Sequence, residues 1–169
     1  IAKSDPELMA AVRKENKPAA SRQLNKISQH PFFKTGESDL IALQALDENF
    51  KLIASTPAKS LDIDPNQASC QNLRAQAARR TGTERLKPVG GICIVGKEMR
   101  YESIQSLGEN SSDGYLKITY NMLHNFAAAE SAFAGLSLKL SLADGTVLYK
   151  SAGWPKPDQD MDRTLIADQ

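Results

Sequence analysis

The chain has 169 residues, which is enough for one domain with a substantial hydrophobic core or for two small ones. Its 21 basic and 20 acidic residues leave a formal net charge of +1, so no overall charge draws it to nucleic acid or to an anionic membrane. No apolar run approaches the roughly 20 residues of a membrane span, and no signal peptide is visible. Because the first residue is Ile1 and not Met, we expect the chain to be a piece of a longer protein.

The N-terminal stretch predicts a broken helix. Residues 4–7 (Ser-Asp-Pro-Glu) are typical of a capping box with proline in the first turn. Pro18 removes a backbone donor and crowds the preceding turn, which predicts a break near residues 16–17. A second helical segment then ends at His30-Pro31. The apolar positions of the two segments are Leu8, Met9, Ala11, Val12, Ala20, Leu24 and Ile27.

Residues 39–47 and 50–55 are apolar on both faces and flank a turn-prone Asp-Glu-Asn sequence. This pattern predicts an antiparallel hairpin in the middle of a sheet that helices cover on both sides. Asp64-Pro65 then predicts the start of a helix that stops at Gly82. Its apolar stripe is short of large residues and consists of Cys70, Leu73 and Ala77, so we expect a half-exposed helix that acts as a lid.

The second half of the chain predicts strands, a helix and a hairpin. Residues 92–95 predict a compact buried strand, and Gly96-Lys97 a turn into a strand over residues 99–105. Alternation predicts a further strand over residues 115–120. Asp144-Gly145 predicts a tight hairpin turn after the alternating leucines. The helix between them has Asn121 as its cap and the stripe Met122, Phe126, Ala129 and Phe133, and the leucines are Leu136, Leu138, Leu140 and Leu142.

Catalytic and metal-binding patterns are missing from the sequence. His30 and His124 do not stand at ligand spacing from a carboxylate or a cysteine. Gly90-Gly91 lacks the spacing of a phosphate-binding loop, and Ser131 lacks the glycines of a nucleophile elbow. We therefore expect no enzyme activity, no cofactor and no metal.

The order of predicted elements resembles the Cache branch of the PAS-like extracytoplasmic sensor domains. Residues 40–56 (LIALQALDENFKLIAST) look like the opening hairpin of that family. Residues 114–151 (GYLKITYNMLHNFAAAESAFAGLSLKLSLADGTVLYKS) look like its closing strand, amphipathic helix and hairpin. Together they cover about a third of the chain. Such domains belong to bacterial chemoreceptors, diguanylate cyclases and sensor kinases.

The resemblance implies an α+β fold with a PAS/Cache-like antiparallel sheet of about five to seven strands. A long N-terminal helix would back the sheet, and a lid helix would lie on the other face above a small-molecule pocket. We expect one domain over residues 1–169, or a boundary near Gly135 followed by a small second module.

The implied function is that of a periplasmic ligand-binding sensory domain in an inner-membrane signalling protein, such as a chemotaxis receptor. Membrane helices would flank it in the full-length protein, and it could form a homodimer. The alternative is a ligandless dimerisation or protein-interaction module of the same fold. We expect no nucleic-acid partner. Family members that bind amino acids carry a spaced set of Tyr, Arg, Trp, Tyr and Asp that cannot be placed in order on this sequence, so no amino-acid ligand is assigned.

Alternation along the closing strand indicates which residues would line such a pocket. If Leu116 and Ile118 face the N-terminal helix, Tyr115, Lys117 and Thr119 face the pocket. The neighbouring strand would contribute Tyr101 and Ser103 or, in the other register, Arg100 and Glu102. Basic residues among tyrosines suit a carboxylate or another anion. The alternative is that they are solvated sheet residues and an arginine that lies on an aromatic ring. The candidate ligand-binding residues are Arg74, Arg100, Tyr101, Ser103, Tyr115 and Lys117.

Cys70 and Cys93 are the only cysteines of the chain. On sequence alone they are either bridged or two small buried apolar residues. The resemblance places them in an oxidising compartment, and it therefore favours a disulfide between Cys70 and Cys93.

Overall fold

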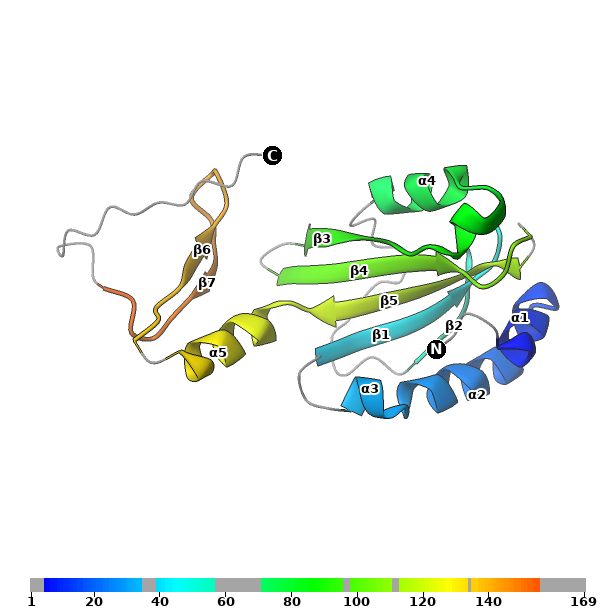
Figure 1. Ribbon diagram of the computed structural model, residues 1–169, viewed down its shortest axis with the longest axis horizontal. Helices are drawn as coiled ribbons and strands as arrows, with labels where there is room; N and C mark the ends of the chain where they lie inside the picture. The colour runs from blue at the N-terminus through cyan, green and yellow to red at the C-terminus, as the bar shows by residue number, and fades with distance from the viewer. Residues whose placement is uncertain are drawn as a thin grey trace.

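Five strands form one antiparallel sheet with the order β2-β1-β5-β4-β3 (Figure 1). The computed structural model describes residues 5–34, 39–56, 71–95, 98–110, 113–133 and 135–155. The predicted strands of this region are confirmed, but the first hairpin lies at the edge of the sheet, because only β1 has a second neighbour. The strands are β1 (Asp39–Leu46), β2 (Leu52–Ser55), β3 (Val89–Val95), β4 (Glu98–Ser106) and β5 (Tyr115–Asn121).

The N-terminal segment folds into α1 (Pro6–Arg13), α2 (Lys17–Ser28) and the short α3 (Pro31–Lys34). Asp5 caps α1, since its side chain accepts hydrogen bonds from two backbone N–H groups of the first turn. The predicted break is confirmed: Glu15 adopts φ +49°, and the Asn16 side chain caps α2. The sheet is therefore backed by two helices in place of one long helix.

One core lies between α1, α2 and the sheet. Leu8, Val12 and Leu24 from the helices pack with Leu43 of β1 and Leu116 of β5. Each of these leucines is at most 3% exposed, and burying such a side chain contributes about 1.5–3 kcal/mol. The periodicity of the sequence thus identified this core correctly.

A second core lies on the other face of the sheet, beneath α4 (Gln71–Arg79) and the 3-10 helix η1 (Gly82–Leu86). Leu73 and Ala77 of α4 are buried, and most of its other described side chains are exposed, as expected for a surface helix. The predicted start of this helix at Asp64-Pro65 lies outside the described residues. The two buried α4 residues pack with Leu46, Val89, Cys93, Ile104 and Tyr115.

Strand β3 differs from the prediction of a compact buried strand. It begins at Val89 and runs along an edge of the sheet. Ile92 is 59% exposed and Ile94 is 43% exposed, because the face that carries them has little covering it. Apolar composition alone did not reveal that one side of this strand is open.

The C-terminal hairpin is separate from the main sheet, contrary to the expectation of a single sheet containing both Lys117 and Leu138. Among the described strands, β6 (Lys139–Ser141) and β7 (Val147–Lys150) pair only with each other, and β5 has β1 and β4 on its two sides. Helix α5 (Leu123–Ala132) joins them to the sheet, and Figure 1 shows the hairpin standing apart from it.

Local predictions for this segment are otherwise confirmed in part. The Asn121 side chain accepts a hydrogen bond from the Leu123 N–H at 3.0 Å, and Gly145 has the positive φ that the hairpin turn requires. Phe126 packs on Tyr149, with the ring centroids 5.4 Å apart. Phe133, expected in the buried stripe, is 64% exposed because α5 does not lie across the sheet.

Gly114 and Gly135 provide a matched pair for testing how tightly the sheet packs on α1. Both have positive φ, +73° and +82°, so alanine is strained at either position. At Gly114 a Cβ atom would lie 2.3 Å from the Leu46 backbone oxygen and 2.6 Å from Val12, whereas at Gly135 nothing lies within 4 Å. We expect Gly114→Ala to lower the free energy of unfolding by at least about 2 kcal/mol more than Gly135→Ala in urea denaturation. Equal losses would contradict this packing.

Candidate functional site

The pairing of β4 with β5 determines which side chains share a face. Lys117 lies opposite Ile104, and Thr119 lies opposite Glu102. Since side chains opposite one another point to the same side of a sheet, Arg100 and Glu102 lie on the face of Lys117. Of the two registers that the sequence left open, the structure adopts this one.

Tyr101 and Ser103 lie on the opposite face. They pair with Tyr120 and Ile118, and Ile118 packs against the core of the N-terminal helices. Burial raises the pKa of Tyr120, and Tyr101 contributes to the same shift. These two predicted site residues are therefore not brought together with Lys117.

Five polar side chains lie buried together on the α4 side of the sheet, and we call this set the polar face. Each is at most 5% exposed, which is unusual for charged and amide groups in the centre of a sheet. Removing such groups from water is costly unless they bind one another or a ligand. The polar face consists of Gln44, Arg100, Glu102, Lys117 and Thr119.

An ion pair occupies the middle of the polar face. The Lys117 Nζ lies 2.9 Å from the Glu102 Oε2, and the two side chains are 6% and 4% exposed. They are diagonal neighbours on adjacent strands, a separation that long side chains can span. In a pair this deeply buried, the attraction between the two charges roughly balances the cost of removing them from water, so the pair contributes little net stability.

Arg100 is neutralised at one end of the polar face. Its Nε donates to the Glu98 Oε2 at 3.0 Å, and the Glu98 side chain is 40% exposed. Arg100 itself is buried. The two basic residues of the polar face, Arg100 and Lys117, thus each have a carboxylate partner.

Arg85 lies against Tyr115 and adds a further basic side chain to the site. The sequence did not predict this position. Its side chain comes from η1 and is buried, with the residue 8% exposed. One guanidinium nitrogen donates to the Ser106 hydroxyl at 3.4 Å and to the Tyr115 hydroxyl at 3.3 Å. The guanidinium carbon lies 5.4 Å from the Tyr115 ring centroid, and Phe50 stacks on the same ring at 4.2 Å.

The guanidinium of Arg85 is incompletely satisfied. Its buried Nε has no hydrogen-bond partner, and no carboxylate pairs with Arg85 in the part of the chain that the structure describes. Nearby at the surface, Lys87 pairs with Glu84, and the Lys87 ammonium lowers the pKa of the Glu84 carboxyl. A stretch rich in basic residues gave no sign that Arg85 alone is buried. Among the described basic residues of this stretch, Arg85 is the one that is buried, and its unpartnered Nε is available to an anion.

The remaining predicted site residues lie around this set. Tyr115 is buried beneath Arg85, and Arg74 is half-buried on α4 next to Leu73. Cys93 is disulfide-bonded. Its predicted partner Cys70 lies outside the described residues, so the pairing of these two cysteines stays a prediction.

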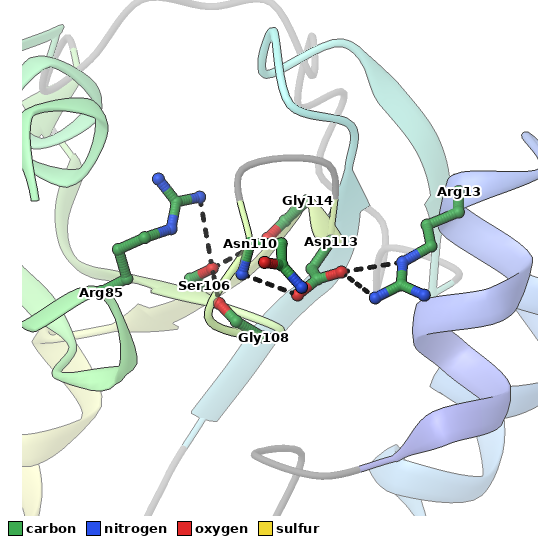
Figure 2. A network of polar contacts seen from close by, with 7 residues as sticks. All are labelled: Arg13, Arg85, Ser106, Gly108, Asn110, Asp113 and Gly114. Carbon is green, nitrogen blue, oxygen red and sulfur yellow. Dashed lines mark hydrogen bonds and ion pairs between the residues drawn. The ribbon is translucent and has the colours of Figure 1, made fainter. Parts of the chain in front are cut away.

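A polar network connects this end of the site with α1 (Figure 2). The Ser106 hydroxyl, which accepts from Arg85, donates to the Gly108 carbonyl at 2.6 Å. In the same loop Asp113 is 1% exposed, and its Oδ1 accepts from the Arg13 Nε at 2.8 Å. The loop between β4 and β5 therefore contacts the candidate site on one side and the N-terminal helix on the other.

A surface hollow of about 260 Å³ lies elsewhere, between the end of α1 and the β1–β2 turn. Charged groups of both signs line it, and it opens to solvent. It does not include the polar face. Its lining residues are Val12, Arg13, Glu15, Asp47, Glu48 and Asn49.

Comparisons with known proteins do not narrow the chemistry of this site. The chain matches no family model, no curated protein and no solved structure. Within the described ranges no three His, Cys, Asp or Glu side chains gather where they could hold a metal ion. In those same ranges no helix has the length and apolar character needed to cross a membrane.

The buried ion pair predicts a specific pattern of stabilities. Lys117→Met leaves the Glu102 carboxylate buried without its lysine, and we expect a loss of about 3–5 kcal/mol in the free energy of unfolding. The double variant Lys117→Met/Glu102→Leu should recover most of that loss in the same denaturation experiment. At the exposed pair Lys87–Glu84, Lys87→Met should cost less than about 1 kcal/mol. A double variant no more stable than the single one would contradict the pairing.

Proposed function

We propose that the protein is a non-catalytic ligand-binding sensory domain, of the Cache type that its sequence resembles. The observation that carries the proposal is the polar face together with Arg85, a buried set of charged and hydroxyl groups on the side of the sheet that α4 covers. The proposal is also supported by the α+β architecture, with an antiparallel five-stranded sheet between N-terminal helices and a surface helix.

The charges of the site favour an anionic ligand. Lys117 and Arg100 are offset by Glu102 and Glu98, whereas no carboxylate of the described residues pairs with Arg85. A guanidinium binds a carboxylate through paired hydrogen bonds, and its unpartnered Nε is one of the groups that such a pair uses. The hydroxyls of Ser106 and Tyr115, both within hydrogen-bond reach of Arg85, would orient the ligand. We therefore propose a small carboxylate.

The network of Figure 2 supports a route from this ligand to the terminal helices. An anion on Arg85 would compete with Ser106, whose hydroxyl also binds carbonyls of the β4–β5 loop. That loop holds Asp113, which pairs with Arg13 near the end of α1. A ligand that binds one arrangement of these bonds better than another shifts the population toward it. In a membrane receptor such a shift in the N-terminal helices would reach the adjoining membrane segment.

We propose a periplasmic location in an inner-membrane signalling protein. The disulfide of Cys93 supports an oxidising compartment, since disulfides rarely persist in the cytosol. The output of the receptor is that of a chemoreceptor, a diguanylate cyclase or a sensor kinase, in keeping with the resemblance.

A thermal-shift screen of small mono- and dicarboxylates tests the proposal. At millimolar concentration we expect at least one of them to raise the melting temperature, because a ligand that binds only the folded state stabilises it. Arg85→Gln should abolish that shift, whereas Arg79→Gln, at an exposed position on α4, should retain it. The melting temperatures without ligand control for the effect of each variant on folding. A shift that survives Arg85→Gln would contradict the role of Arg85.

The second candidate is a ligandless dimerisation module, and one observation favours it. Ile92 and Ile94 are exposed next to each other on one face of the edge strand β3. Exposed apolar side chains on an open edge are typical of a strand that pairs with another chain. Two results together would replace the sensory proposal with this one. No carboxylate would raise the melting temperature, and the protein would have a dimeric mass that Ile92→Lys reduces to that of the monomer.

A further inference from the structure

The two hairpins of the molecule have the same strand pairing at a constant separation in sequence. In β1–β2, Gln44 lies opposite Ser55 and Ala45 opposite Ala54. In β6–β7, Lys139 lies opposite Lys150 and Leu140 opposite Tyr149. Each residue of the second hairpin is numbered 95 higher than its counterpart in the first. The register shift also falls at corresponding places, after Ala45 and after Leu140.

The turns and the open ends of the two hairpins correspond in the same way. Phe50 and Gly145, again 95 apart, both have positive φ, +61° and +85°. Positive φ is common in hairpin turns, so the turns alone do not establish the correspondence. The ends of the hairpins opposite the turns share a rarer pair of hydrogen bonds. There the Thr56 N–H donates to the Leu43 carbonyl while its hydroxyl accepts from the Leu43 N–H. Ser151 makes the same two bonds with Leu138.

A helix precedes and contacts each hairpin. Helix α2 packs on β1 and β2 through the first core. Helix α5 contacts β7 and its end, through the ring contact of Phe126 with Tyr149 and a hydrogen bond between Ser151 and Glu130. A helix followed by a hairpin therefore occurs twice in the chain, although the two helices are not separated by the same 95 residues. Of the 18 residue pairs compared from residues 39 and 134 onward, only Leu43 and Leu138 are identical. With so few identical residues, the repeat leaves no pattern in the sequence.

The two copies differ in what covers them. In the first copy β5 pairs with the outer edge of β1, and Leu43 and Ala45 are 0% exposed. In the second, the corresponding Leu138 and Leu140 are only half-buried, and no strand of the described residues pairs with the outer edge of β6. Val147 is 41% exposed and Phe133 64%. The second copy thus has a helix and a hairpin but, among the described residues, no strand that corresponds to β5.

We infer that α5, β6 and β7 begin a second unit of this architecture, and that the outer edge of β6 binds an antiparallel β-strand from the polypeptide that follows Gln169. The correspondence identifies the occupant: shifted by the same 95 residues, the counterpart of β5 (Tyr115–Asn121) falls beyond Gln169. That strand should alternate apolar residues toward Leu138 and Leu140, as Leu116 and Ile118 of β5 do toward Leu43 and Ala45.

Amide hydrogen exchange tests the inference without a variant that could fail to fold. Leu138 bonds toward β7, so by alternation the Lys139 N–H points to the outer edge, as the Gln44 N–H points to β5. In the chain of residues 1–169 we expect Gln44 to be protected and Lys139 to exchange rapidly. In the natural polypeptide extended by about 80 residues, Lys139 exchange should slow by about 100-fold or more. Leu140, bonded within the hairpin, serves as the internal control.

Three results would overturn the inference. A coding sequence that stops after Gln169 would leave no strand to supply. Rapid exchange of Lys139 in the extended polypeptide would show that the edge stays open. Slow exchange of Lys139 already in residues 1–169, together with a dimeric mass, would assign the edge to a second copy of this chain.

Discussion

The buried ion pair of Lys117 and Glu102 is the constraint on which the rest of the site depends. A sheet in a domain of this size normally buries apolar side chains on both faces, and here the N-terminal helices cover one face in that way. On the other face two full charges lie 2.9 Å apart at the centre of the sheet. Because a buried pair contributes little to stability compared with apolar packing, its presence favours a functional role for this face.

Arg85 places a positive charge at one end of that face, which favours an anionic ligand. The charges of Lys117 and Arg100 are balanced within the sheet. The Arg85 guanidinium, which pairs with no carboxylate in the described part of the chain, lies at one end of the site against Tyr115 and Ser106. The same Ser106 hydroxyl binds the β4–β5 loop, and Asp113 of that loop binds Arg13. A ligand at Arg85 would therefore act on bonds that already connect the two sides of the sheet. These contacts connect the candidate ligand site with α1. Coupling between the two requires that the contacts have two arrangements and that the ligand binds one of them more tightly.

Short-range features of this molecule could be predicted from the sequence, and long-range ones could not. The break before Pro18, the strand over residues 115–120 and the Asp144-Gly145 turn each depend on neighbouring residues only, and all are confirmed. Whether Arg100 or Tyr101 faces Lys117 depends on a register that one strand does not specify. Whether Leu138 joins the main sheet depends on which edges are free, and the burial of Arg85 depends on packing between η1 and β5. None of these leaves a local pattern.

The most direct measurement of the central claim is an NMR titration of the ¹⁵N-labelled protein with small carboxylates, following the Nε–Hε signal of the Arg85 guanidinium. We expect one carboxylate to shift that signal saturably, with accompanying amide shifts at Tyr115, Lys117 and Ser106 along the α4 side of the sheet. Saturable binding that leaves the Arg85 signal unchanged and moves only exposed residues would contradict the assignment of this face as the ligand site.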